Sequence, residues 1–181
     1  QFNPLALASG VYRYGESSFS AGDEVLYYQN GKTASISVVE TNDGIKSIAT
    51  NGKPDAAIYP SSMDYSSDEI TMTMLAALPL AIHPQAQSLA NIGLGSGLTT
   101  HTLLLSNEPA LIDTIEIEST VVGAIEHFGA TTENALVDPR SNIIIDDAKS
   151  FFSRNKKRYD VIVSEPSNPW VAGVSSLFST E

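Results

Sequence analysis

The sequence predicts an α/β protein in which an N-terminal β-meander precedes a doubly wound parallel sheet. Residues 23–60 are rich in Val, Ile, Tyr and Thr and contain Asn-Gly and Asp-Gly dipeptides, a pattern typical of β-hairpins. From residue 88 onward, short apolar strands alternate with helical segments, which indicates parallel strands joined by right-handed helical crossovers. A Gly-x-Gly-x-Gly turn at residues 93–97 joins the first of these strands to a helix.

The N-terminal part is expected to form a sheet that is covered on one side only. Residues 1–22 carry few periodic signals and are expected to form an irregular lead-in. Strands are expected over Glu24–Gln29, Thr33–Val39 and Ile45–Ala49. The dipeptides Asn30-Gly31, Asp43-Gly44 and Asn51-Gly52 supply the positive φ angles of two-residue hairpin turns. Ile36 and Val38 share one face of the second strand and Ser35 and Ser37 the other, which favours one buried face.

The pattern changes to helical spacing at Asp68, where a helix with Met72 and Met74 as core-filling residues is expected to be disturbed near its end by Pro79. Strands are expected over Ser88–Ile92, Thr114–Glu118, Asn142–Asp146 and Asp160–Ser164, and helices over Leu98–Leu105, Thr120–Phe128 and Ala148–Arg154. This change divides the chain into a lead-in and β-hairpin domain, residues 1–66, and a doubly wound parallel-sheet domain, residues 67–181. The chain stops just after an expected interior element, so we expect this domain to be truncated at its C-terminus.

Composition restricts the classes of partner. The net charge of −11 and the pI of about 4.5 make nucleic acid an unfavourable partner, whereas a small cationic substrate would be attracted. The chain has no cysteine, and its three histidines lack ligand spacing, so no metal site is expected. The sequence shows neither a run of ~18 apolar residues nor a signal peptide, which predicts a cytoplasmic domain without direct membrane contact.

Three features predict a nucleoside site at the carboxyl ends of the parallel strands. Gly93, Gly95 and Gly97 lack a Cβ, so the backbone can turn sharply and approach a ligand closely; the alternative is a tight strand-to-helix turn. Glu116 ends the next strand at the spacing where a carboxylate meets ribose hydroxyls; the alternative is a surface acid. Asp147 follows the third strand and could accept a hydrogen bond from an adenine amino group or cap a helix.

The fourth strand leads into a proline-stiffened loop that is expected to carry the reacting group. Glu165 directly follows this strand, where a buried carboxylate could orient an amine nucleophile and accept its proton. The alternative is a loop carboxylate bonded to local backbone. Trp170, the only tryptophan, either covers the edge of the core or forms a wall of the ligand site.

The order of these segments resembles the spermidine synthase (polyamine aminopropyltransferase) family, in which an N-terminal β-domain precedes a class I methyltransferase-like Rossmann domain. The resemblance spans roughly Val25 to Glu181. It rests on Met-Leu-Ala-Ala-Leu-Pro-Leu at residues 74–80, the glycine loop, Ile-Glu-Ile-Glu at residues 115–118 and Asp-Asp-Ala at residues 146–148. It also rests on Tyr-Asp-Val-Ile-Val-Ser-Glu-Pro-Ser-Asn-Pro at residues 159–169. The resemblance implies ribose binding by Glu116, adenine binding by Asp147 and catalysis by Glu165.

The departures from the family pattern fall on the amine side. The family's catalytic aspartate is replaced by Glu165 and its polyamine-binding aspartate by Asn168, while Thr-Met-Thr at residues 71–73 stands where the family often has Tyr-His-Glu. The hairpin at residues 51–56 and the loop at residues 164–170 resemble a divergent branch that is often fused to membrane-spanning segments. The chain could therefore be the soluble domain of a membrane-anchored parent protein.

The resemblance implies a transferase that moves the aminopropyl group of decarboxylated S-adenosylmethionine to an amine, with an altered amine site that includes Asn168 and Trp170. One alternative is a methyltransferase that uses ordinary S-adenosylmethionine, because Ser-Asn-Pro-Trp at residues 167–170 resembles the Asn-Pro-Pro-Tyr loop of amino-group methyltransferases. The other is a non-catalytic nucleoside- or polyamine-sensing domain. A homodimer is a further expectation.

Overall fold

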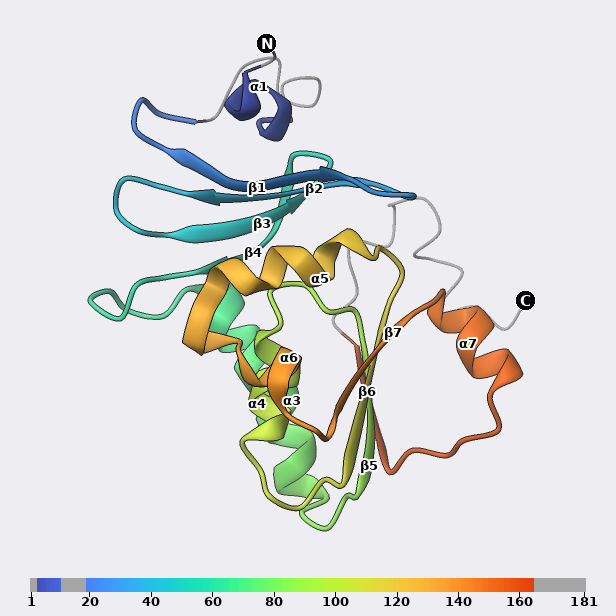
Figure 1. The fold of residues 1–181 in the computed structure, drawn as a ribbon. Helices are drawn as coiled ribbons and strands as arrows, with labels where there is room; N and C mark the ends of the chain where they lie inside the picture. The colour runs from blue at the N-terminus through green and yellow to red at the C-terminus, as the bar shows by residue number, and fades with distance from the viewer. Residues whose placement is uncertain (1–2, 11–18, 165–181) are drawn as a thin grey trace.

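The computed structural model describes residues 3–10 and 19–164, which form two four-stranded sheets with helices between and around them (Figure 1). The antiparallel sheet follows the short helix α1 (Pro4–Ala8) and consists of β1 (Glu24–Asn30), β2 (Ser35–Glu40), β3 (Lys46–Thr50) and β4 (Lys53–Ile58). Its strand order is β1-β2-β3-β4, so it is a meander as the sequence predicts. The strand β4 was not among the predicted strands, and its Pro54 is tolerated because β4 is an edge strand.

The two-residue turns predicted for the meander are found at one of three positions. The predicted two-residue turn at Asn51-Gly52 is confirmed, because Thr50 pairs with Lys53 and the two turn residues have φ angles of 50° and 73°. The predicted two-residue turn at Asp43-Gly44 is wrong, because Glu40 pairs with Lys46 and the connection spans residues 41–45, although Gly44 has a φ of +79°. The predicted two-residue turn at Asn30-Gly31 is wrong, because Asn30 pairs with Ser35 and the connection spans residues 31–34. There the Gly31 N–H donates to the Ala34 carbonyl over 2.8 Å.

The antiparallel sheet is covered on both faces around β2, which corrects the one-sided burial expected from its sequence. Ile36 and Val38 pack in the main core, but Ser37 and Val39 on the opposite face are each only 1% exposed. The helix α1, which was expected to be irregular, packs on that second face beside β1 and β2 (Figure 1). The Asn3 side chain starts this helix by accepting the Leu5 N–H over 3.0 Å.

The helix α3 (Ser67–Ile82) leads from the first sheet to the second. It begins with a capping box in which Ser66 accepts the Glu69 N–H and Glu69 accepts the Ser66 N–H. The Glu69 carboxylate is buried and also accepts the Tyr59 N–H over 3.2 Å, which ties the helix to the end of β4. Met72 is buried as predicted, whereas Met74 is 44% exposed, so core filling holds for one of the two methionines.

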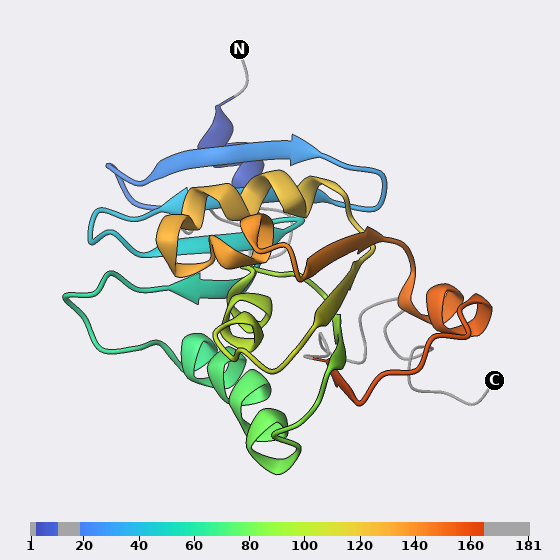
Figure 2. The same ribbon diagram turned by 60° about the horizontal axis from the view of Figure 1, so that its bottom comes forward.

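The second sheet is parallel and has the strand order β7-β6-β5-β8. Its strands are β5 (Ser88–Ile92), β6 (Leu111–Glu116), β7 (Ser141–Ile145) and β8 (Val161–Ser164). Its helices are α4 (Leu98–Leu104), α5 (Thr120–Ile125), the 3-10 helix η1 (Glu126–Thr131), α6 (Asn134–Val137) and α7 (Ala148–Arg154). Figures 1 and 2 show α3 and α4 on one side of this sheet and α7 on the other, so the sheet is doubly wound as predicted.

One hydrophobic core joins the two sheets. The helix α5 lies beneath the antiparallel sheet (Figure 1), and its Val121 and Ile125 pack with Ile36, Val38 and Ile48 of that sheet. The Tyr27 hydroxyl donates to the Thr120 carbonyl over 2.9 Å at the same junction. The loops after β5 and β6 are therefore held in place from the N-terminal sheet. Within the described ranges, no helix has the length and apolarity needed to cross a membrane.

Candidate functional site

The order in which successive strands are added to the parallel sheet reverses at β5. From β5 the sheet extends to β6 and β7 on one side and to β8 on the other. In doubly wound sheets, ligands bind beyond the carboxyl ends of the strands at such a switch point. Four strand ends meet there, because Ile92 pairs with Ile115 and with Ser164, and Glu116 pairs with Ile145.

The glycine loop that follows β5 has a backbone that only glycine adopts readily. Gly93, Gly95 and Gly97 have φ angles of +91°, +53° and +87°. Apart from its chain neighbours, a Cβ at Gly93 or Gly95 would meet no atom of residues 3–10 and 19–164 within 4 Å, whereas a Cβ at Gly97 would press on Ile125 and Thr132 at 3.3 Å. The first two glycines therefore leave the loop backbone open to a ligand, and the third allows the start of α4 to pack closely.

Glu116 lies at the end of β6, directly beside the glycine loop. Its carboxylate is buried and accepts the Leu94 N–H and the Glu118 N–H, each over 2.9 Å. Burial raises the pKa of this carboxyl above its ordinary value, although the backbone hydrogen bonds partly oppose that rise. Glu116 is thus a buried acid that fixes the backbone of the predicted nucleoside loop.

Asp147 lies at the end of β7 and caps α7. Its carboxylate accepts the Ser150 N–H over 2.7 Å, and this hydrogen bond lowers the pKa of Asp147. The neighbouring Asp146 turns to Arg154, with which it forms an ion pair. The Asp146 N–H donates to the Glu116 carbonyl over 3.0 Å, so the segment that carries Asp147 adjoins Glu116. The structure therefore brings the glycine loop, Glu116 and Asp147 to one edge, as predicted.

The remaining predicted site residues, Glu165, Asn168 and Trp170, lie outside the described residues. The described part of β8 ends at Ser164, which pairs with Ile92 next to the glycine loop.

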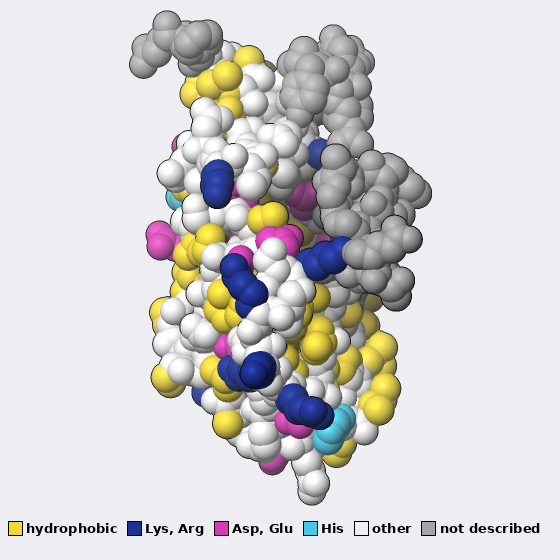
Figure 3. All heavy atoms as spheres, turned by 90° about the vertical axis from the view of Figure 1, so that its right-hand side faces the viewer, with side chains coloured by type: hydrophobic (Ala, Val, Ile, Leu, Met, Phe, Trp, Pro, Cys, Tyr) yellow, Lys and Arg dark blue, Asp and Glu magenta, His cyan; other side chains and the backbone are white. Residues whose placement is uncertain are grey.

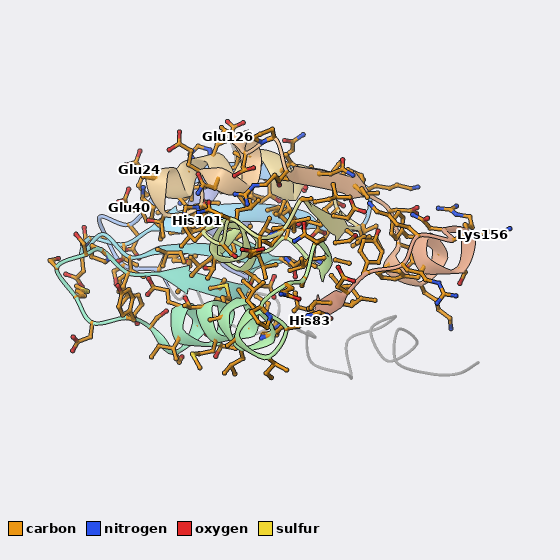
Figure 4. The ribbon with its side chains drawn as sticks, turned by 90° about the horizontal axis from the view of Figure 1, so that it is seen from below. Glu24, Glu40, His83, His101, Glu126 and Lys156 are labelled. Atoms are coloured by element: carbon orange, nitrogen blue, oxygen red, sulfur yellow. The ribbon has the colours of Figure 1, made fainter. Side chains whose placement is uncertain are left out.

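The histidines are placed apart, as Figure 4 shows for His83 and His101. The His101 Nδ1 accepts the Asn134 N–H over 3.3 Å, and burial lowers the pKa of this imidazole. The His127 ring lies 5.6 Å from the Tyr27 ring between the two sheets. Over residues 3–10 and 19–164, no group of three acidic or histidine side chains is arranged to hold a metal ion.

Two polar residues at this edge were missed by the sequence analysis. Asn91 in β5 is 2% exposed, and its Nδ2 donates to the Gly93 carbonyl over 3.0 Å and to the Thr100 Oγ1 over 2.9 Å. A polar side chain inside an apolar strand directly before a glycine loop is the signal that could have indicated it.

The second missed residue is Glu118, which is 3% exposed. Its carboxylate accepts the Thr33 N–H over 2.7 Å and the Thr120 N–H over 3.2 Å, as well as both hydroxyls of these residues. Burial alone would raise the pKa of Glu118, but these hydrogen bonds outweigh it and lower the pKa to about 2. The sequence gives no local signal for this contact, because the partner Thr33 lies 85 positions away.

We expect Glu118 to make stability depend on acid pH. Its pKa is depressed from 4.5 to about 2 on folding, so its contribution is fully present above pH 4.5 and is lost as the pH falls toward 2. Glu118→Gln should lower the free energy of unfolding at pH 7 by roughly 2–3 kcal/mol, because buried N–H donors lose a charged acceptor. Urea unfolding at pH 7, 4.5 and 3 measures this. The difference in free energy of unfolding between the wild type and Glu118→Gln should become smaller as the pH falls. A difference that does not change with pH would contradict the depressed pKa of Glu118.

Comparison with known families agrees with this architecture. The family model described as the spermine/spermidine synthase domain matches residues 68–181. The chain belongs to this family. The match includes the glycine loop, Glu116 and Asp147, together with the predicted Glu165 and Asn168.

Relatives in this family include bacterial polyamine aminopropyltransferases. That of Caldicellulosiruptor saccharolyticus is 28% identical over 147 residues, which cover 81% of this chain and 50% of the relative. Polyamine aminopropyltransferase 1 of Pseudomonas aeruginosa is 32% identical over 97 residues, which cover 53% of this chain and 34% of the relative. This chain thus spans half or less of the length of these two curated relatives.

Solved spermidine synthases share the fold. One, crystallised with the transition-state analogue AdoDATO, superposes with a TM-score of 0.71 at 23% identity and covers 86% of this chain and 50% of its own. The spermidine synthase of Thermotoga maritima superposes with a TM-score of 0.66 at 23% identity. This match covers 80% of this chain and 47% of the Thermotoga chain. The predicted class, a β-meander followed by a class I methyltransferase-like sheet, is confirmed.

Proposed function

We propose that this chain forms the adenosyl-binding part of an aminopropyltransferase that uses decarboxylated S-adenosylmethionine. The observation that carries the proposal is the convergence of the open glycine loop, Glu116 and Asp147 at the switch point of the sheet. Membership in the spermine/spermidine synthase family supports this reaction class. The spermidine synthase of similar fold that holds AdoDATO supports an adenosyl ligand at this edge.

Each of the three elements has a distinct role in the proposed site. Gly93 and Gly95 let the loop backbone approach the ligand. The Glu116 carboxylate accepts backbone N–H groups of Leu94, Ile117 and Glu118, and its remaining acceptor capacity is proposed to receive hydrogen bonds from the ribose hydroxyls. Asp147 would accept from the adenine amino group at the end of β7.

The proposed reaction is a substitution at carbon. The amine nitrogen attacks the aminopropyl carbon bonded to the sulfonium sulfur, the new C–N bond forms, and the C–S bond breaks to release methylthioadenosine. The amine loses a proton, and Glu165 is the proposed acceptor by its position directly after β8. Asn168 and Trp170 are proposed to contact the amine.

The charge distribution indicates where a cationic amine would not bind. Five of the ten Lys and Arg residues fall within residues 149–158, in and after α7. Figure 3 shows Lys and Arg side chains gathered on this face of the molecule. Because like charges repel, we propose that the amine enters from the β8 side of the glycine loop, where Glu165 is expected.

Substitution of Glu116 tests the adenosyl site. In the full-length protein, Glu116→Gln should weaken binding of decarboxylated S-adenosylmethionine at least tenfold, because an amide is a poorer acceptor for the ribose hydroxyls. Isothermal titration calorimetry measures this, and Glu133→Gln, which removes an exposed carboxylate, is the matched control. Unchanged affinity of the Glu116 variant would contradict the proposed site.

The same calorimetry with ordinary S-adenosylmethionine separates the proposal from a methyltransferase. Preferential binding of the decarboxylated form is expected for an aminopropyltransferase. Binding without turnover of any amine would favour the sensing domain instead.

A further inference from the structure

The connection between β1 and β2 lies directly on a buried carboxylate beside the adenosyl site. The turn at residues 31–34 belongs to the N-terminal sheet, and Glu118 belongs to the loop between β6 and α5. Glu118 Oε2 accepts the Thr33 N–H over 2.7 Å, the Thr33 hydroxyl over 2.8 Å and the Ala34 N–H over 3.3 Å. Its Oε1 accepts the N–H and hydroxyl of Thr120 over 3.2 and 3.1 Å. One side chain thus joins two sheets and the start of α5.

Gly31 shows how closely the turn and the carboxylate fit. A Cβ on Gly31 would lie 2.0 Å from Glu118 Oε1 and 2.2 Å from its carboxyl carbon. Any other residue at this position must displace the carboxylate. The absence of a side chain at Gly31 therefore leaves the space that the Glu118 carboxylate occupies.

The backbone of Glu118 is also connected to the glycine loop, through the Glu116 carboxylate. The Glu118 N–H donates to Glu116 Oε1 over 2.9 Å, and Glu116 Oε2 accepts the Leu94 N–H over 2.9 Å. A continuous series of contacts therefore runs from the β1–β2 turn through Glu118 and Glu116 to Leu94. Because Glu116 is buried, its carboxylate orientation depends on these two donors together with the Ile117 N–H, which belongs to the same loop after β6.

We propose that Glu118 is a positioning residue for the adenosyl site: it anchors the β1–β2 turn to the loop after β6 and thereby fixes Glu116 and the glycine loop. The expected effect of Glu118 on ligand affinity rests on the proposed function. The structural coupling of Glu118 to the Leu94 N–H is independent of the proposed function.

Both the negative charge and the side-chain length of Glu118 are needed to position Glu116. A carboxylate is an acceptor only and satisfies five donors at once, whereas the amide of glutamine would turn an N–H₂ group toward some of them. Aspartate keeps the charge but is shorter by one methylene, so it cannot reach Thr33 and Thr120 together. Both substitutions should loosen Glu116 without touching the ligand.

The test compares Glu118→Gln with Glu133→Gln in the full-length protein. We expect Glu118→Gln to raise the dissociation constant for decarboxylated S-adenosylmethionine at least tenfold by calorimetry and to speed amide exchange of Leu94 at least tenfold by NMR. The control at Glu133 should change neither. A folded Glu118→Gln with unchanged affinity and unchanged Leu94 exchange would overturn the proposal.

Two milder variants keep the proposal testable if Glu118→Gln does not fold. Thr33→Val removes one hydroxyl donor, and Gly31→Ala pushes the carboxylate aside; both should raise the dissociation constant and the Leu94 exchange rate in the same direction. If both variants fold and leave these quantities unchanged, Glu118 does not position the site. If the wild-type protein binds no adenosyl ligand but Leu94 exchange responds as expected, the coupling stands and the proposed function fails.

Discussion

Gly95→Val is expected to abolish adenosyl-ligand binding, by at least a hundredfold in the dissociation constant, while the chain stays folded. Gly95 has a φ of +53°, which a β-branched residue tolerates poorly, so the loop must change its path. A Cβ there would meet no atom of the described part of the chain within 4 Å beyond its chain neighbours, so the valine side chain would occupy the open side of the loop rather than the core. Calorimetry and circular dichroism on the full-length protein measure binding and folding.

Gly129 offers a matched control for this variant. It also has a positive φ, +62°, and among the residues that the structure describes a Cβ added there would meet no atom within 4 Å beyond its chain neighbours, but it lies in η1 and not in the glycine loop. Gly129→Val should therefore strain the backbone and leave ligand affinity near that of the wild type. If Gly95→Val binds the ligand as tightly as Gly129→Val and the wild type do, the glycine loop is only a strand-to-helix turn.

Periodic segments of the second sheet were predictable because each is defined locally. The predicted strand Ser88–Ile92 and helix Ala148–Arg154 have the same bounds as β5 and α7. Apolar strand residues and an Asp cap before α7 mark these elements within a few positions. The second strand was predicted over Thr114–Glu118 but runs over Leu111–Glu116, so element type was more reliable than boundaries.

Features that depend on distant contacts were missed. Ser37 looks like a solvent-facing strand residue, but it is buried, and its strand β2 contacts α1, which carries little periodic signal. The short helix α6 was also missed, because four residues are too few for a helical period. These elements are specified by packing across the fold rather than by local sequence.

In the candidate site, too, residues placed by local sequence patterns were predictable and residues defined by distant contacts were not. The glycine loop, Glu116 and Asp147 were predictable because strand ends in a parallel sheet fall on one edge. Asn91 and Glu118 were not, because each is defined by its hydrogen-bond partners. Glu118 binds Thr33 across 85 positions, and Asn91 binds Thr100 from the following helix. The residues that support the site were thus less visible in the sequence than those expected to touch the ligand.

Glu165→Asp is expected to raise turnover of decarboxylated S-adenosylmethionine with putrescine by at least tenfold in the full-length protein. Glu165 stands where the resembling family has its catalytic aspartate, and the extra methylene displaces the carboxylate by roughly 1 Å, which can cost about a hundredfold in rate. Asn168 in place of a second aspartate removes a charge that would match a diamine, which carries about two positive charges at neutral pH. The wild-type protein should therefore be a slow spermidine synthase.

Release of methylthioadenosine measures this turnover, and Glu133→Asp, an exposed substitution of the same kind, is the control. The increase should appear in kcat, with the affinity for the adenosyl ligand unchanged, because Glu116 and Asp147 remain in place. Adding Asn168→Asp to Glu165→Asp should lower the KM for putrescine, since a carboxylate attracts the second ammonium group. Wild-type turnover with putrescine at the rate of the related aminopropyltransferases would show that Glu165 and Asn168 do not impair the amine site. A further loss in Glu165→Asp would show that the site is built around glutamate.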